Sequence, residues 1–218
     1  MSFPLKAKAG KILDILQELY PDVKVGFHYT NPFKILIVTM LSAQSTDRQT
    51  GPAAELLFQA YDTPAKLSGA PISEIETRIK SVGIYKNKAK HIRKTSEILL
   101  GRFSGKVPDT MDGLLTLPGV GRKTANIVLS KAFGLNVGIA VDTHVYRLAH
   151  RLGLASEKVR DRVEEELVSL YPPSRYMDIN SLLIHHGRVV CKARKPLCAE
   201  CAISGLCEYF AETDSSKN

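Results

Sequence analysis

The sequence predicts an all-α protein, and three observations carry that prediction. Apolar residues recur at helical spacing over most of the 218 residues. Glycine and proline residues divide these segments into helix-sized pieces joined by short loops. Runs of alternating apolar and polar residues, which would indicate half-buried strands, are scarce. Helices packed on helices around an apolar core are therefore the expected architecture.

The first two helices are predicted near the N-terminus. Residues 5–20 carry apolar side chains at helical spacing, and Pro21 ends that pattern. A second helix begins at 31–32, because the first turn of a helix tolerates proline. Its middle, 35–41, is almost wholly apolar and predicts a core helix. The polar residues 42–47 that follow are either a helix cap and loop or the wall of a cleft.

The remaining helices are predicted from the same periodicity and from their start and stop signals. Asp109 is expected to cap one of them, and Asp142 or Thr143 another. About the last 12 residues, which end in ETDSSKN, are expected to fray. The predicted helices span residues 52–59, 73–81, 86–100, 109–115, 121–133, 143–152, 156–170 and 175–184.

The bulk properties favour a protein that binds a polyanion. The net charge is +8 and the isoelectric point is near 9.3, and nucleic acid is the leading partner for such a chain. No apolar run approaches the roughly 20 residues that a membrane span needs. The N-terminal residues lack the apolar core of a signal peptide, so we expect an intracellular protein without a membrane partner.

The segment 117–126, LPGVGRKTAN, predicts a phosphate-binding turn. Gly119 and Gly121 let the backbone approach an anion, and the following helix start offers unpaired backbone N–H groups. Arg122 and Lys123 add positive charge there. The spacing fits neither a P-loop nor a dinucleotide fingerprint. A helix, a hairpin and a second helix of this kind grip the DNA backbone without reading bases; the alternative is a turn whose glycines serve packing alone.

The four cysteines of the chain lie together near its C-terminus, with the spacing C-x6-C-x2-C-x5-C. Disulfides are not expected in a reducing compartment. Four thiolates suit either zinc or a [4Fe–4S] cluster. Because only one short C-x2-C pair is present, the spacing favours the cluster over zinc, which remains the alternative. The predicted ligands are Cys191, Cys198, Cys201 and Cys207.

A basic loop lies between the first two of these cysteines. It contains Lys192, Arg194 and Lys195. A metal centre would hold this loop rigid, and its predicted task is to bind a DNA phosphate. The alternative is a solvated, charged loop.

Lys123 and Asp142 are the candidate catalytic residues. A lysine in the first turn of a helix, beside Arg122, lies where positive charge disfavours the ammonium form and activates the amine. Such an amine can attack C1′ of a sugar, expel the base and leave a Schiff base. A carboxylate nearby would accept a proton and stabilise the positive centre. Lys123 as a phosphate contact and Asp142 as an ordinary N-cap are the alternatives at this point.

Four motifs, in order, resemble the endonuclease III family of DNA glycosylases: LSAQSTD at 41–47, LPGVGRKTAN, VDTH and the cysteine pattern. The resemblance covers nearly the whole chain. It implies a helix-hairpin-helix glycosylase with AP lyase activity on oxidised pyrimidines. It also implies a six-helix domain at 25–136, a cluster domain formed by 1–24 and 137–218 with its cluster loop at 191–207, and an active-site cleft between the two domains.

The resemblance also implies residue roles. Lys123 matches the Schiff-base nucleophile and Asp142 the catalytic carboxylate. Gln44 matches the residue that fills the gap left by the flipped base. Ile84 matches an apolar wedge that the family commonly makes leucine, and either shape can open a base step. The expected DNA contacts are Gln44, Ile84, Gly119, Val120, Gly121, Arg122, Lys192, Arg194 and Lys195.

The partner implied by the resemblance is double-stranded DNA that carries damaged pyrimidines or abasic sites. We expect the protein to act as a monomer, and in the cytoplasm or nucleoid if the source is prokaryotic.

Two alternative functions remain at the level of sequence. One is a thymine or uracil mismatch glycosylase of the same superfamily. An adenine-specific relative would carry a glutamate in the helix before 41–47, where Thr39 stands instead and no acidic residue occurs. The other is a non-catalytic iron–sulfur protein that binds DNA, against which the presence of both Lys123 and Asp142 argues.

Overall fold

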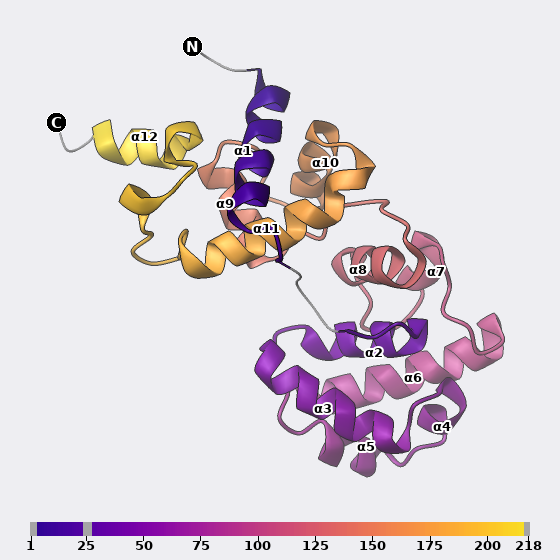
Figure 1. Cartoon of the computed structure of the whole chain (residues 1–218). Helices are drawn as coiled ribbons and strands as arrows, with labels where there is room; N and C mark the ends of the chain where they lie inside the picture. Colours follow the sequence, from indigo (N-terminus) through magenta and orange to yellow (C-terminus); the bar gives the residue numbers. More distant parts are fainter. Residues whose placement is uncertain (1–3, 24–27, 216–218) are drawn as a thin grey trace. The chain divides into compact units, whose positions relative to one another are not determined.

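The structure, a computed structural model, describes residues 4–23 and 28–215, and within these ranges it is helical without strands (Figure 1). The predicted all-α fold class is confirmed. None of the described helices is both long and apolar enough to cross a membrane. The α-helices are α1 (Leu5–Leu19), α2 (Pro32–Ser42), α3 (Asp47–Ala60), α4 (Pro64–Ser68), α5 (Ile72–Arg78), α6 (Tyr85–Phe103), α7 (Met111–Leu115), α8 (Arg122–Phe133), α9 (Thr143–Arg151), α10 (Arg160–Leu170), α11 (Tyr176–Val189) and α12 (Glu208–Ser215).

The chain forms two compact units. One is Gly26–Leu135, and the other combines Met1–Val25 with Asn136–Asn218. Each unit has its own cluster of buried apolar side chains. The predicted hairpin and the predicted cysteine site therefore belong to different units.

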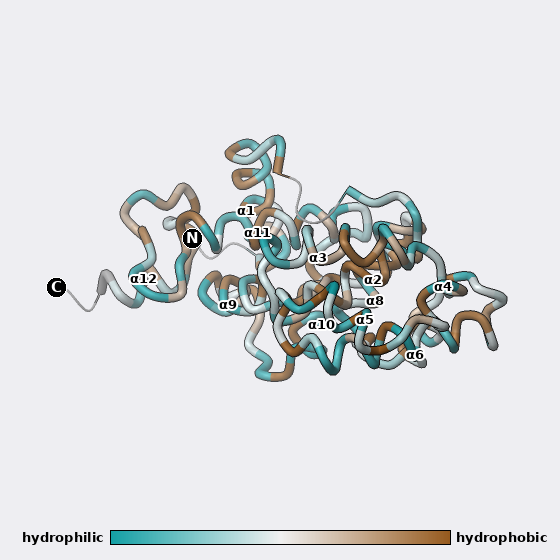
Figure 2. Tube along the Cα trace, turned by 90° about the horizontal axis from the view of Figure 1, so that it is seen from below, coloured by the Kyte–Doolittle hydropathy of each residue, from teal (hydrophilic) through white to brown (hydrophobic). Residues whose placement is uncertain are grey.

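Helix α2 is the centre of the unit Gly26–Leu135. Eight of its residues are buried, and it packs against α3, α6 and α8. A helix that is apolar on all sides must be surrounded, so its position follows from its composition. Its apolar residues stand out in the hydropathy colouring (Figure 2). The helix starts where the sequence predicts, and the Asn31 side chain caps this start by accepting from the backbone N–H groups of Phe33 and Lys34.

The other unit gathers both ends of the chain. Helix α1 packs against α10 and α11, and α9 packs against α10, α11 and α12. Ile12 and Leu16 of α1 are almost completely buried beside Leu148 of α9 and Ile179 of α11. The N-terminal helix thus completes a core that is otherwise built from the last third of the chain.

Several predicted helix boundaries are wrong, and local hydrogen bonds explain two of them. Helix α3 begins at Asp47 instead of residue 52, because Thr46 and Gln49 form a capping box that includes a 3.1 Å bond from the Thr46 N–H to Gln49 Oε1. Helix α10 begins at Arg160 instead of residue 156. The Ser156 N–H and hydroxyl both donate to the Glu166 carboxylate, which holds that segment outside the helix.

Other differences concern one cap, one additional helix and the ends of two helices. Thr110, not Asp109, caps α7 by accepting from the Gly113 N–H. Helix α4 was not predicted, although Thr63 and Pro64 are a good cap and first residue. The segment expected to fray contains α12, which ends at Ser215, and its residues 216–218 lie outside the described residues. Helix α11 continues beyond residue 184 to Val189.

Candidate functional site

The hairpin between α7 and α8 has one glycine that the backbone requires. Gly119 has φ +79°, and a Cβ on it would lie 2.8 Å from His91 Nδ1 of α6. The Thr95 hydroxyl, also from α6, donates to the Pro118 carbonyl at 3.2 Å. Both contacts fix the hairpin against α6. Gly119 is therefore needed for the turn itself, whatever the hairpin binds.

Gly121, the second hairpin glycine, is not required by packing. Its φ is −100°, and no atom lies within 4 Å of a Cβ built on it. Gly121 is the N-cap of α8 and has no side chain that could accept from the first-turn amides. An acceptor for such amides then has to come from another group, and an anion is favoured there. Lys123 is exposed in this first turn.

Val120 lies between the two glycines and points inward. Its side chain is 7% exposed, and its N–H donates to the Leu117 carbonyl at 3.1 Å. The neighbouring Arg122 is half-buried. The Val120 side chain could contact DNA only if the hairpin opened. The residues on either side of Val120 are therefore the ones available for a direct DNA contact.

Several of the predicted DNA contacts have a strained backbone conformation. The described non-glycine residues with positive φ are Gln44 (+54°), Ile84 (+49°), Ser104 and Lys195. A non-glycine residue in this region costs on the order of 1–3 kcal/mol and persists only where its surroundings enforce it. Ile84 is the most unusual, because it is β-branched and its side chain is 55% exposed. Three of these four residues are among the predicted DNA contacts.

The structure brings the Gln44 and Ile84 segments together. A Cβ on Gly83 would lie 2.7 Å from the Gln44 carbonyl oxygen, so only glycine allows this approach. The Gly83 N–H donates to the Ser45 hydroxyl at 2.9 Å. Gln44 and Ile84 are thus exposed neighbours of a backbone contact between two loops that lie 38 residues apart in sequence.

Asp142 is the N-cap of α9. Its Oδ1 accepts from the backbone N–H groups of His144 and Val145, both at 2.8 Å. The second carboxylate oxygen, Oδ2, takes no part in these two bonds. Two residues before it, the Ala140 carbonyl accepts from Asn180 Nδ2 at 2.6 Å. The capping role therefore exists and leaves an oxygen for chemistry.

Helix α9 also connects Asp142 to the cysteine segment. The connecting residue is Arg147, which is not among the predicted site residues. Arg147 donates from Nη2 to the carbonyls of Gly187 and Cys191, each at 3.0 Å. The same nitrogen lies 3.2 Å from His144 Nδ1, and burial lowers the pKa of His144. The sequence shows Arg147 as a cation one turn beyond the VDTH motif. It does not show the acceptors of Arg147, because they are distant in sequence.

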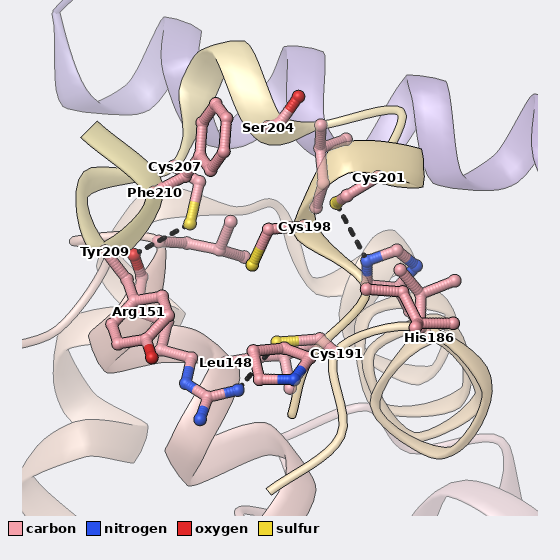
Figure 3. Close-up of a pocket in the computed structure, with 15 residues that line it drawn as sticks. Leu148, Arg151, His186, Cys191, Cys198, Cys201, Ser204, Cys207, Tyr209 and Phe210 are labelled. Atoms are coloured by element: carbon pink, nitrogen blue, oxygen red, sulfur yellow. Dashed lines mark hydrogen bonds between the residues drawn. The ribbon is translucent and has the colours of Figure 1, made fainter. Parts of the chain in front are cut away.

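All four cysteines line one pocket (Figure 3). They are free thiols. Arg151 of α9 donates from Nη1 to Cys191 Sγ at 3.2 Å, and the Cys207 thiol donates to the Arg151 carbonyl at 3.2 Å. The apolar wall of the pocket is formed by Leu148, Leu152, Ile203 and Phe210.

A buried histidine stands beside this pocket. His186 is 1% exposed, its Nε2 lies 3.4 Å from Cys201 Sγ, and its Nδ1 lies 3.0 Å from the Tyr20 hydroxyl. Burial lowers the pKa of His186 to about 4 and raises those of Cys201 and Cys207. A neutral imidazole of this kind can donate to a sulfur ligand and orient it.

The pocket fits a group held by four sulfurs. Within residues 4–23 and 28–215, no three or more His, Cys, Asp or Glu side chains are gathered as around a single metal ion. The donor set is instead four thiols around one partly apolar space, which matches the ligands of an iron–sulfur cluster.

The basic loop is exposed and tied down at its start. Arg151 donates to the carbonyls of Lys192 (2.8 Å) and Ala193 (3.1 Å), and its guanidinium lies over the Tyr209 ring. Lys192, Arg194 and Lys195 are all exposed. The loop therefore presents three cations on a backbone that Arg151 holds from within.

The predicted site residues divide between the two units. The hairpin with Lys123, together with Gln44 and Ile84, belongs to Gly26–Leu135. Asp142, the cysteines and the basic loop belong to the other unit. Within these units, the structure brings the Gln44 and Ile84 segments together and gathers the four cysteines around one pocket.

Sequence comparison relates the chain to known DNA repair proteins. The sequence pattern of the HhH-GPD superfamily of base excision DNA repair proteins matches residues 37–173, and that of the iron–sulfur binding domain of endonuclease III matches residues 191–207. Endonuclease III of Synechocystis sp. is 45% identical over 202 residues, which cover 93% of this chain and 92% of that protein.

Two solved structures are similar in fold. A trapped endonuclease III–DNA covalent intermediate, in an estranged-adenine complex, superposes with a TM-score of 0.91 at 38% identity and covers 98% of this chain and 100% of that one. A thermostable thymine-DNA glycosylase superposes with a TM-score of 0.83 at 26% identity over 94% of this chain and 98% of that one.

Proposed function

Because the chain belongs to the endonuclease III family of the HhH-GPD superfamily, we propose that Lys123 and Asp142 carry out its reaction on oxidised pyrimidines in duplex DNA. The protein is a base excision repair DNA glycosylase with AP lyase activity. It binds damaged DNA and carries an iron–sulfur cluster. The roles of individual residues in this reaction are proposals.

Lys123 is the proposed nucleophile. Its neutral amine attacks C1′ of the damaged nucleotide, the N-glycosidic bond breaks, and the base leaves with the bonding electrons and takes up a proton. Loss of the amine proton and opening of the sugar ring then give a Schiff base between Nζ and C1′. Removal of a C2′ proton expels the 3′ phosphate by β-elimination, and water releases the lysine.

Asp142 is the proposed carboxylate. Its Oδ1 is occupied by two backbone N–H groups, which fix the orientation of the carboxylate. Oδ2 is then the oxygen that stabilises the positive charge at C1′ and accepts the proton of the attacking amine. Capping and catalysis are compatible because they use different oxygens of the same group.

The proposed DNA contacts fall into three groups. Gly119, Val120, Gly121 and Arg122 form the hairpin that holds a phosphate, with backbone and cationic contacts. Gln44 fills the gap left by the extruded nucleotide, and Ile84 enters the adjacent base step. Lys192, Arg194 and Lys195 bind the backbone electrostatically.

The four cysteines are the proposed ligands of a [4Fe–4S] cluster. In this role the cluster stabilises the segment 191–207 and supports the basic loop, and zinc is the less favoured occupant. We further propose a six-helix domain at 25–136 and a cluster domain at 1–24 and 137–218. An intracellular location is proposed because the substrate is cellular DNA.

The observation that supports this function most strongly is Lys123 itself. It is exposed in the first turn of a helix whose N-cap is a glycine, in a chain 45% identical to an endonuclease III over 93% of its length. A mismatch glycosylase is less well supported, because identity to the thymine-DNA glycosylase structure is 26% against 38% for the endonuclease III complex.

Base release separates the two activities. Duplexes carrying either thymine glycol or a thymine–guanine mismatch are incubated with excess protein, and the released bases are measured. We expect release of thymine glycol at least about tenfold faster than release of mismatched thymine. The reverse order would favour the mismatch glycosylase.

A further inference from the structure

A buried lysine joins the two loops that carry Gln44 and Ile84. Lys88 lies in the first turn of α6 and is 4% exposed. Its ammonium donates to the Leu41 carbonyl at 2.7 Å and to the Ser45 hydroxyl at 2.9 Å. Both partners belong to the loop and helix end on either side of Gln44.

The Leu41 carbonyl is a natural partner for a cation. It is one of the last carbonyls of α2, which have no intrahelical donor. The C-terminal end of a helix also attracts positive charge. Lys88 therefore carries its charge away from the start of its own helix, where it is disfavoured, to the end of α2, where it is favoured.

Ser45 connects Lys88 to the second loop. Its hydroxyl oxygen accepts from Lys88 Nζ and from the Gly83 N–H, each at 2.9 Å. These two bonds use both acceptor positions of a hydroxyl. Gly83 immediately precedes Ile84, and Ser45 immediately follows Gln44, so the network touches the neighbour of each strained residue.

The network supplies the constraint that the two strained residues need. Gln44 and Ile84 both have positive φ and are exposed, and neither conformation persists without enforcement by its surroundings. Gly83 also lies close to the Gln44 carbonyl, where a Cβ would be 2.7 Å from the oxygen. The contacts of Lys88, Ser45 and Gly83 together hold the two loops in one arrangement.

We propose that Lys88 is a positioning residue, which through Leu41 and Ser45 holds Gln44 and Ile84 in the conformation that enters the duplex. The proposal rests on the proposed function, since it needs Gln44 and Ile84 to act on DNA. Burial also lowers the pKa of Lys88 to about 8, as expected for an ammonium that the fold retains away from water.

This role makes a prediction that a purely structural role does not. Extruding a paired base requires the intruding residues, whereas a base without a partner costs less to extrude. Loss of the Lys88 network should therefore slow base release most when the damaged base is paired. It should slow base release least when the damaged base has no base opposite it. General damage to the fold would slow both substrates by the same factor.

The experiment compares single-turnover release of thymine glycol from two duplexes, one with adenine opposite the lesion and one with an abasic analogue opposite it. The variants are Lys88→Met, which keeps an unbranched side chain and removes the ammonium, and Ser45→Ala, which removes the shared acceptor. Lys94→Met is the matched control, because it removes one cation from the exposed face of α6. Circular dichroism and urea unfolding report whether each variant is folded.

We expect Lys88→Met and Ser45→Ala to slow release from the paired duplex about tenfold and from the unpaired duplex less than about threefold. Lys94→Met should match the wild type on both. Equal slowing on both duplexes, or no slowing on either, would overturn the positioning role. If Lys88→Met does not fold, Ser45→Ala decides alone. A wild type that releases no base from either duplex would contradict the proposed function itself.

Discussion

At the scale of single residues, Asp142 shows how one side chain can serve fold and chemistry together. Asparagine caps a helix about as well as aspartate, because its amide oxygen can accept the same N–H bonds. Substitution by asparagine therefore separates the two roles in a way that alanine would not.

Asp142→Asn should keep the fold and lose turnover. We expect the free energy of unfolding to change by less than about 1 kcal/mol, because the cap to His144 and Val145 survives. The single-turnover rate should fall by about a hundredfold or more, because the carboxylate is lost. Affinity for abasic DNA, measured by fluorescence anisotropy, should remain near that of the wild type.

The control for this prediction is Asp142→Ala, which removes the cap as well as the charge. It should be less stable than Asp142→Asn by about 1 kcal/mol. If Asp142→Asn unfolds or turns over normally, then Asp142 is an N-cap and the catalytic assignment is wrong.

Some of the functional residues can be identified from the sequence, whereas others can be identified only from the structure. Asp142 and Lys123 are visible in the sequence because they sit at helix starts beside recognisable motifs. Lys88 is not visible, because it lies among the lysines of KNKAK and only tertiary packing buries it. The roles of Arg147 and Arg151 cannot be identified from the sequence either, because their acceptors lie about 40 residues away along the chain.

At the scale of elements, the hairpin contains two glycines with different reasons to be there. Gly119 has a positive φ and packs on His91, whereas Gly121 has neither constraint. A phosphate approaching the start of α8 would explain the second glycine, and packing alone would not.

The two glycines can be tested as a pair. Gly119→Ala should lower the free energy of unfolding by about 1–3 kcal/mol, because of its backbone conformation and the contact with His91. Gly121→Ala should cost less than about 1 kcal/mol and should still weaken binding of abasic duplex DNA. Urea unfolding and anisotropy measure the two effects. Normal DNA affinity in Gly121→Ala would mean that the hairpin glycines serve packing only.

The cysteine segment is the second element that can be tested alone. Cys198→Ser should lose the visible absorption and iron of the cluster, and DNA affinity with them, because the 191–207 segment has little apolar core of its own. Ser204→Ala, a residue that lines the same pocket, should keep both. DNA binding that survives loss of the cluster would contradict its support of the basic loop.

Helix boundaries show the limits of the sequence at this scale. The core helix α2 is predicted correctly from its apolar composition, and Asp142, one of the two predicted caps of α9, is its N-cap. The sequence places the start of α3 too late, at residue 52, whereas the capping box lies at Thr46 and Gln49. The start of α10 depended on Glu166, which no local rule identifies.

For the whole molecule, the fold class follows from helical periodicity and the family from the order of motifs, while the network that joins two loops through Lys88 is known only from the structure. The positive net charge of +8 is also a property of the whole chain. It predicts that DNA affinity falls steeply as salt rises, because binding releases counterions.

The salt dependence can be assigned to particular cations. Plots of log affinity against log salt concentration for abasic duplex DNA should be linear, and Arg194→Ala should reduce the slope by about 1. Lys94→Met serves again as the control on the exposed face of α6. An unchanged slope in Arg194→Ala would indicate that the basic loop is solvated and does not bind a phosphate.

Borohydride trapping tests whether Lys123 forms a Schiff base with the damaged nucleotide. Wild type and Lys123→Ala are incubated with duplexes carrying thymine glycol or an abasic site, reduced, and resolved by electrophoresis. We predict a covalent adduct with both duplexes for the wild type and none for the variant. A folded, cluster-containing wild type that gives no adduct, or a Lys123→Ala variant that still gives one, would contradict the assignment of Lys123.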